Sequence, residues 1–272
     1  MSIIAISRGT FSGGEALAKV VAERLGYRCL SREANLGAVA KTYRVPSEEL
    51  TAAMERRPSF FEQVVGEHTV YLKCVRAALC EEARGDKLVY HGFLGQLLLP
   101  GVSHVLGVRV IADAELRIQA AMRQRNLARK DAQAYIEKVD KERRKWTRYL
   151  FDVDWEAPHL YDVVLNLSRM SLETACETVA RLIERPEFQP TAASRKALED
   201  LALSSRVSAA LARNHRTRDA DLTVTADEGI VIVTGWTRWP EVEKAIPEVV
   251  RRVEGVQKVR SKVVLGLIHA EC

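Results

Sequence analysis

The sequence has little of what secreted, membrane-spanning or metal-binding proteins are rich in. Its 272 residues include five cysteines with no CxxC pair and six scattered histidines. These numbers and spacings argue against a disulfide framework and against a zinc site. No apolar run approaches the roughly 20 residues that span a bilayer, and the N-terminus lacks the basic and long apolar regions of a secretory signal. These absences predict a reduced, cytoplasmic protein with no transmembrane segment and no metal site of its own.

The chain also lacks a strong excess of charge of one sign. The net charge is +5, from 41 Lys and Arg against 36 Asp and Glu. The hydrophobic share of 47% and the charged share of 28% exclude a disordered chain or a collagen-like fibre. The cations are concentrated in residues 117–148, where eleven Lys and Arg face four Asp and Glu, a local balance of +7. Such a segment suits a phosphate-bearing ligand, and a solvated helix face explains it equally well.

The first two thirds of the chain alternate short apolar segments with amphipathic ones. The expected strands are residues 3–6, 27–30, 88–90, 105–111 and 163–165, and the expected helices are 15–25, most of 34–84, 115–125, 131–150 and a last one from 171. This alternation predicts an α/β domain in which a parallel five-stranded sheet has helices on both faces.

A change of pattern predicts a second domain. Residues 185–191 contain two prolines among polar neighbours, so we expect a linker over residues 186–194 between domains at 1–185 and 195–272. Beyond the linker the expected order is helix, strand, strand, helix, strand, with Asp227-Glu228-Gly229 as the hairpin turn. This αββαβ order is typical of a small α+β domain.

The strongest local signal is a glycine-rich turn between the first strand and the first helix, made of Gly9, Thr10, Phe11, Ser12, Gly13 and Gly14. Backbone amides at such a helix N-terminus suit an anion. Gly9 and Gly14 have the glycine spacing of the phosphate-binding pattern GxxxxGK(S/T), but Glu15 and Ala16 stand where that pattern has Lys and a hydroxyl. The alternative is a tight turn without a ligand, in which Glu15 pairs with Lys19 one helical turn later.

The run Ile6 to Gly14, Ile-Ser-Arg-Gly-Thr-Phe-Ser-Gly-Gly, resembles the opening of the cytidylate kinase-like proteins, which are P-loop kinases of the nucleoside monophosphate kinase class. The resemblance covers about residues 1–185. Further segments carry it in the same order: Leu17-Ala18-Lys19, Leu25-Gly26-Tyr27, Ser31-Arg32-Glu33, Tyr90-His91-Gly92, Ala112 to Arg117, Asp140 to Arg143, Trp155, Pro158, Tyr161-Asp162 and Leu165-Asn166. The resemblance implies a P-loop kinase fold, ATP and Mg²⁺ as cofactors, nucleotide binding by the turn Gly9 to Gly14, and an acceptor site that includes Arg32 and Gly92.

Three positions depart from the family's usual pattern. Glu15-Ala16 stands where Arg-Glu is usual, and Ser31 stands where an aspartate is usual. Gly92-Phe93-Leu94 stands where Gly-Arg-Gly is usual, which removes an arginine that would serve the acceptor phosphate. Phosphoryl transfer depends on positioned cations, so these changes favour a nucleotide-binding protein that does not catalyse.

The resemblance gives the cationic segment a role as a lid, with a salt-bridged surface helix as the alternative. Arg143 lies on the apolar side of its helix and needs a partner there, and Asp140, three residues earlier, is the plain structural candidate. The resemblance implies instead that Arg143 and Arg148 close over the phosphates as the catalytic residues, with support from Arg117 and Asp140. Guanidinium groups suit this role because they bind phosphate through two parallel hydrogen bonds.

Residues 195–265 resemble a BON domain, a small binding module without catalytic chemistry. The segment Gly229 to Gly235 and the later Gly255-Val256 carry most of this resemblance. It implies a partner that is either an anionic surface or another protein. Trp236 and Trp239 either fill the interface between sheet and helix or form an exposed docking patch.

Three functions remain open from the sequence. The first is ATP-dependent phosphoryl transfer to a nucleoside monophosphate, CMP-like, or to a similar small acceptor. The second is a degenerate, non-catalytic nucleotide-binding or regulatory protein whose BON-like module docks to a partner or an anionic surface. The third is an assembly adaptor with an empty glycine turn. We expect no nucleic acid partner, and a homo-oligomer stays open.

Overall fold

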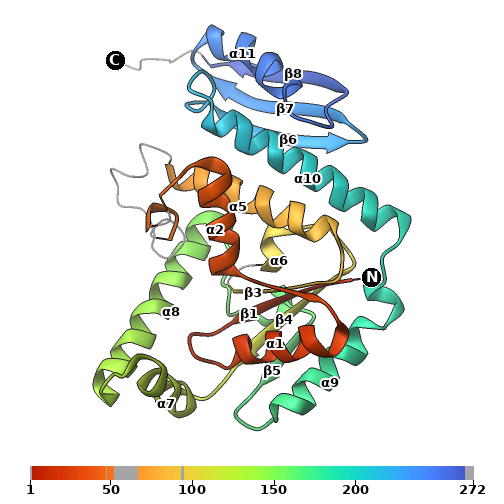
Figure 1. Cartoon of the computed structure of the whole chain (residues 1–272). Helices are drawn as coiled ribbons and strands as arrows, with labels where there is room; N and C mark the ends of the chain where they lie inside the picture. Colours follow the sequence, from red (N-terminus) through yellow and green to blue (C-terminus); the bar gives the residue numbers. More distant parts are fainter. Residues whose placement is uncertain (1, 47, 52–66, 93–94, 267–272) are drawn as a thin grey trace. The chain divides into compact units, whose positions relative to one another are not determined.

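The computed structural model describes residues 2–46, 48–51, 67–92 and 95–266 (Figure 1). By their internal contacts the residues form two compact units. The first comprises residues 1–58 with 85–194, and the second comprises 59–84 with 195–272. Among the described residues, no helix has both the length and the apolar character needed to cross a bilayer.

The first unit is built on a parallel sheet. Its strands are β1 (Ile3–Arg8), β2 (Arg28–Ser31), β3 (Leu88–Gly92), β4 (Val105–Ile111) and β5 (Val163–Asn166), in the order β2-β3-β1-β4-β5. The chain runs from β1 to the edge strand β2, and β3 later takes the place between them. The end of β1 therefore lies at the centre of the sheet's carboxyl edge. That edge is where ligands bind in open parallel sheets. The predicted fold class is confirmed for this unit.

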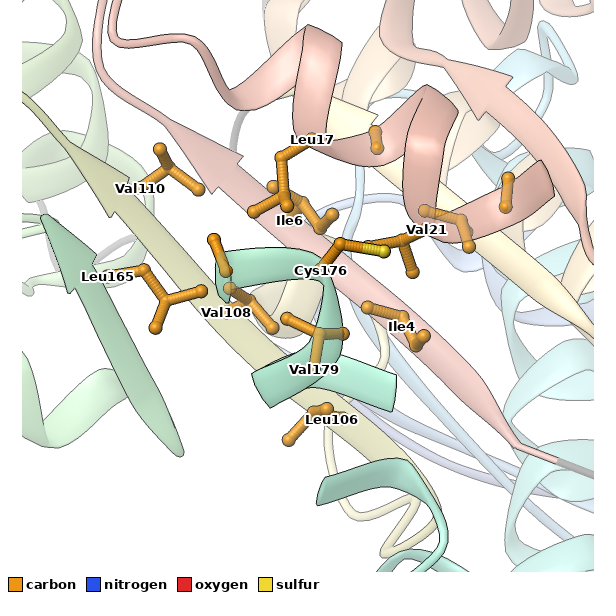
Figure 2. Packing of buried hydrophobic residues seen from close by; sticks show 14 of the residues in the cluster. Ile4, Ile6, Leu17, Val21, Leu106, Val108, Val110, Leu165, Cys176 and Val179 are labelled. Carbon is orange, nitrogen blue, oxygen red and sulfur yellow. The ribbon is translucent and has the colours of Figure 1, made fainter. Parts of the chain in front are cut away.

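Helices pack on both faces of this sheet, with α1 (Gly14–Leu25) and α9 (Leu172–Ile183) on one face and α6 (Gly95–Leu98) on the other. Helix α2 (Arg32–Tyr43) contacts β2 and β3, and α7 (Ala114–Arg125) packs against α8 (Arg129–Phe151). Short 3₁₀ turns lie at Pro158–Leu160 and Pro186–Phe188. On one face Ile4 and Ile6 of β1 pack with Leu17 of α1 and Val179 of α9 (Figure 2). On the other face Gly95 of α6 lies close to Ala5 and Tyr90. The two-sided burial explains why β1 is apolar at successive positions.

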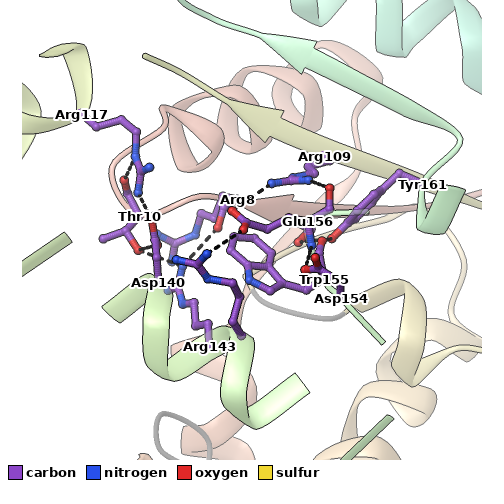
Figure 3. Close-up of polar contacts among 12 residues, drawn as sticks. Arg8, Thr10, Arg109, Arg117, Asp140, Arg143, Asp154, Trp155, Glu156 and Tyr161 are labelled. Atoms are coloured by element: carbon purple, nitrogen blue, oxygen red, sulfur yellow. Dashed lines mark hydrogen bonds and ion pairs between the residues drawn. The ribbon is translucent and has the colours of Figure 1, made fainter. Parts of the chain in front are cut away.

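The segment before β5 is tied to the sheet by buried polar groups. The Tyr161 hydroxyl donates to the carbonyl oxygen of Trp155 at 2.6 Å and lies 3.3 Å from the Ser7 hydroxyl (Figure 3). The Arg109 guanidinium lies over the Trp155 ring at 5.0 Å. The amide of Gly107 donates to Asp162 at 2.7 Å. Trp155, Tyr161 and Asp162, which carry part of the family resemblance, therefore have a structural role.

We expect Tyr161→Phe to lower the free energy of unfolding by about 1–2 kcal/mol, because it leaves buried hydrogen-bond partners unsatisfied. Urea unfolding followed by circular dichroism measures the change. Tyr27→Phe is the matched control, since Tyr27 is partly exposed and its hydroxyl forms no hydrogen bond within the described part of the chain. Equal stability of the two variants would contradict this role.

Helix α5 (Glu67–Arg84) belongs to the second unit. Polar contacts join it to α10 (Ala192–Arg213): Arg84 lies 2.9 Å from Glu199, and Arg206 lies 2.8 Å from Glu81. The sequence analysis placed this stretch in the domain 1–185, because periodicity identifies a helix and not the unit on which it packs. The boundaries 1–185, 186–194 and 195–272 stay a prediction.

The second unit has the predicted αββαβ order. After α10 come β6 (Asp221–Asp227), β7 (Ile230–Thr237), α11 (Pro240–Arg251) and β8 (Lys258–Leu265). Strand β7 is central, antiparallel to β6 and parallel to β8. Val231 and Val233 of β7 pack with Val207 of α10 and Ile246 of α11 in the core. A Cβ at Gly235 would lie 2.0 Å from the carbonyl oxygen of Asp221, so only glycine fits there.

Candidate functional site

The glycine turn joins the end of β1 to the start of α1. Gly13 precedes the helix with a φ of +85°, in the left-handed region that glycine adopts without strain. A Cβ at Gly14 would lie 2.5 Å from the Cβ of Arg8. The Leu17 amide is bonded to Gly13 O at 3.1 Å, which leaves the amides of residues 13–16 without a partner inside the helix. These four donors at the positive end of the helix dipole suit an anion.

A cavity of about 1340 Å³ opens beside these amides. Its lining contains six arginines and lysines against three glutamates, a balance of +3. The cations are Arg8, Lys19, Arg32, Arg125, Lys138 and Arg143, and the anions are Glu15, Glu33 and Glu142. The volume and the positive balance suit a nucleotide with several phosphates. The six turn residues predicted to bind phosphate, Gly9 to Gly14, all line this cavity.

Helices α7 and α8 pack on the turn through a polar network (Figure 3). The Thr10 hydroxyl lies 2.7 Å from Asp140 of α8 and 3.2 Å from the guanidinium of Arg143. Arg143 also donates to Arg8 O at 3.3 Å. Arg117 of α7 donates to Thr10 O at 2.7 Å and forms an ion pair with Asp140. Two arginines and one carboxylate of the cationic hairpin are thus held against the glycine turn.

An apolar contact adds to this network. The Phe11 ring at the tip of the turn lies 6.0 Å from the ring of Tyr135, centroid to centroid. Phe11 also packs against the cluster of Ile118 and Ala121 on α7 with Ile136 on α8. Its φ is +59°, a conformation that costs a non-glycine residue energy and that this packing stabilises.

The structure separates the two arginines assigned to the lid. Arg143 lines the cavity and contacts the turn, whereas Arg148 is exposed and is not among the lining residues. Asp140 binds Thr10 of the turn and Arg117 of α7. It therefore contacts groups outside its own helix, which the alternative of an intrahelical pair with Arg143 did not predict.

The expected acceptor side lies at the ends of β2 and β3. Arg32 is only 8% exposed and lies 3.1 Å from Glu33, which also lies 3.5 Å from Arg8. Burial raises the pKa of Glu33, but Arg32 and Arg8 outweigh it and the net pKa is lowered. Gly92 does not line the cavity, but a Cβ there would lie 2.6 Å from the Cβ of Arg32. The role of Gly92 is therefore to let Arg32 approach β3.

Sequence reasoning missed several of the cavity residues, among them Arg8, His91, Arg125, Tyr135 and Lys138. His91, at the end of β3, is 3% exposed. Burial lowers its pKa, and the neighbouring Arg8 lowers it further, so the imidazole is neutral at neutral pH. A signal was present on α8, where residues 135, 138, 139, 142 and 143 recur at helical spacing on one face.

Glu15 lies at the mouth of the cavity and is paired as the structural alternative predicted. Its carboxylate is 2.8 Å from Lys19 and 4.0 Å from Arg8. The hydrogen bond with Lys19 lowers the pKa of Glu15, so the group is charged at neutral pH. The Glu15 side chain is half exposed and bonded to Lys19. It therefore does not occupy the place of a ligand at the amides of residues 13–16.

We expect Glu15→Gln to tighten ATP binding by about fivefold, the effect of one unit charge removed near phosphate in water. Isothermal titration calorimetry measures the change. Glu23→Gln, at an exposed position later on α1, is the control and should leave the affinity unchanged. Weaker binding by Glu15→Gln would show that the carboxylate supports the site.

The residues present do not form a site for the magnesium that the resemblance implied. Ala16 has no hydroxyl, and the three lining carboxylates each lie beside a cation: Glu15 beside Lys19, Glu33 beside Arg32, and Glu142 beside Lys145 at 3.0 Å. The part of the chain that the structure describes contains no cluster of three His, Cys, Asp or Glu. We assign no protein ligand to a metal, and no step proposed below depends on one.

Comparison with protein families decides the family of the N-terminal part of the chain. Residues 3–169 match the cytidylate kinase-like family. The chain belongs to the cytidylate kinase-like family. Residues 199–266 match the BON domain, so both predicted resemblances are confirmed. A comparison with curated proteins found no match.

One solved structure with a TM-score above 0.5 shows the same fold in the kinase-like part. A protein from Eubacterium ventriosum, described as uncharacterized, is 19% identical with a TM-score of 0.52, over 68% of this chain and 100% of its own. Shikimate kinase from Bacteroides thetaiotaomicron is 11% identical with a TM-score of 0.43, over 68% of this chain and 99% of its own. Shikimate kinase from Acinetobacter baumannii is 15% identical with a TM-score of 0.40, over 67% of this chain and 93% of its own. The first likeness supports the fold alone, and the other two are too weak to bear on function.

Proposed function

We propose that this cytidylate kinase-like protein transfers a phosphoryl group from ATP to a nucleoside monophosphate, CMP-like, or to a similar small acceptor. The observation that carries the proposal is the juxtaposition of the amides of residues 13–16 with the Arg143 guanidinium at one cavity. The family and the fold support a nucleotide kinase as the protein class. The proposed location is the cytoplasm, where ATP is available as the phosphoryl donor.

In the proposed reaction, the amides of residues 13–16 bind the donor phosphates. An oxygen of the acceptor attacks the γ-phosphorus, and the bond from that phosphorus to the bridging oxygen of the β-phosphate breaks, so ADP leaves. Arg143 stabilises the negative charge on the transferring group, and Arg8 and Arg32 bind the acceptor phosphate. Catalysis then comes from placement and charge, as is usual for phosphoryl transfer.

The second candidate function is nucleotide binding without turnover, in which the BON domain docks to a partner or an anionic surface. The paired Glu15 at the position of the usual lysine favours it. In this candidate the cavity holds a nucleotide as a signal, and the protein acts through what the nucleotide stabilises.

A coupled assay of ADP release with ATP, Mg²⁺ and a panel of monophosphates separates the candidates, together with thermal unfolding in ATP. Acceptor-dependent ADP release supports the kinase. ATP-dependent stabilisation without turnover supports the non-catalytic candidate. An adaptor with an empty turn shows neither effect.

A further inference from the structure

The sheet of the second unit has one buried face and one open face. Along β7 the side chains of Val231 and Val233 are buried against α10 and α11. The alternate residues Ile230, Ile232, Thr234 and Trp236 are on the opposite face. They are partly or fully exposed, with 46% of Trp236 accessible.

The register places three kinds of side chain in three columns on this open face. The β6 column is Asp221, Thr223, Thr225 and Asp227, and the β8 column is Lys258, Arg260, Lys262 and Val264. All eight are exposed. The open face therefore has an acidic edge, an aliphatic and aromatic centre, and a basic edge.

This division of charge decides between kinds of partner. A polyanion, either a nucleic acid or an anionic lipid surface, is attracted to the β8 column and repelled by Asp221 and Asp227 at the other edge. A uniformly basic partner is attracted to Asp221 and Asp227 and repelled by the β8 column. A surface that is basic opposite β6, apolar opposite β7 and acidic opposite β8 satisfies all three columns, and the open face of a second copy is such a surface.

We propose that a second copy of this chain packs on the open face of the BON sheet, with the two faces related by a twofold axis that runs along the strands. That rotation lays each β6 over the partner's β8, and each β7 over the partner's β7. Face-to-face sheets pack about 10 Å apart, which side chains of this length fill. The contact is isologous, so it closes at two copies.

The pairing also follows row by row. Thr223 shares a row with Lys262, and Thr225 shares a row with Arg260. In the dimer each of these threonines lies opposite the basic residue of its own row in the partner. Asp227 likewise lies opposite the partner's Lys258, and it keeps its contact with Lys196 of its own chain. Trp236 lies opposite the partner's Trp236, where aromatic burial contributes most to association.

The test is a charge exchange between two variants of the full chain. The acidic variant is Lys258→Glu, Arg260→Glu and Lys262→Glu, and the basic variant is Thr223→Lys, Thr225→Lys and Asp227→Lys, the three β6 positions that share their rows. Each variant alone places like charges opposite each other. Mixed in equal amounts, the introduced glutamates of one variant face the introduced lysines of the other, and the unaltered columns remain complementary.

Analytical ultracentrifugation over a concentration series gives the mass of each sample. We expect a dimer for the wild-type chain, monomers for each variant alone, and a dimer for the mixture. Restoration by mixing distinguishes lost contact from misfolding, because a misfolded variant is not rescued by another. A wild-type monomer throughout the series, variants that dimerise alone, a mixture that stays monomeric, or masses that grow past a dimer would each overturn the proposal.

Vesicle flotation supplies the remaining comparison. Wild-type chain mixed with phosphatidylglycerol vesicles is expected to stay with the unbound protein as a dimer. Flotation that the acidic variant abolishes would assign the basic column to a lipid surface and overturn the proposal.

Discussion

Arg143→Ala is expected to weaken ATP binding by about tenfold to a hundredfold, the range for losing a charge-assisted hydrogen bond. Arg143 is the one lid arginine of the sequence prediction that both lines the cavity and contacts the glycine turn. Its guanidinium supplies positive charge where the usual P-loop has a lysine. Isothermal titration calorimetry with ATP measures the loss.

The chain offers a matched control for this variant. Arg148→Ala removes the same group from the same helix at an exposed position, and it should bind ATP as the wild type does. Arg143→Lys keeps the charge without the planar fork, so we expect an intermediate affinity. Equal loss in Arg143→Ala and Arg148→Ala would contradict the placement of the site at the glycine turn.

Asp140→Ala is expected to lower the free energy of unfolding by about 3 kcal/mol, because it breaks a largely buried ion pair from one side. Asp140 is 8% exposed, binds the Thr10 hydroxyl and pairs with Arg117. Without it the guanidinium of Arg117 keeps only Thr10 O as a described partner of that network. We also expect weaker ATP binding, since Arg143 and the turn lose the group that fixes Thr10.

Urea unfolding of Asp140→Ala, Arg117→Ala and the double variant tests this account. The double variant should lose less than the sum of the single losses, because each single variant leaves the partner charge uncompensated. Asp131→Ala, at an exposed position in the first turn of α8, is the control and should cost only a few tenths of a kcal/mol. Strictly additive losses would show that Asp140 and Arg117 act independently.

The fold was predictable because each element has a local signal. Strand β1 is apolar at successive positions, the turn after it is rich in glycine, and α1 has an apolar stripe of Leu17, Val21 and their neighbours. The hairpin turn at Gly229 and the αββαβ order were likewise visible in the chain. Each of these features depends on residues close together in sequence.

The site was predictable only in part, because it depends on long-range contacts. The glycine turn and Arg143 were found from sequence. Arg148 was not brought to the cavity, since five residues along a helix turn a side chain by about 140° relative to Arg143. Arg8 and His91 reach the cavity because β1 and β3 are neighbours in the sheet, and a strand order that departs from the chain order hides that from the sequence.

The central claim is that backbone amides at the start of α1, with Arg143, bind a polyphosphate without the usual P-loop lysine. Its most direct test is ¹⁵N-resolved NMR of the full chain during titration with ATP. We predict saturable shifts of the amides of Gly13, Gly14, Glu15 and Ala16 and of the Arg143 side chain. Saturable ATP binding that leaves these five signals in place, or no binding at all, would contradict it.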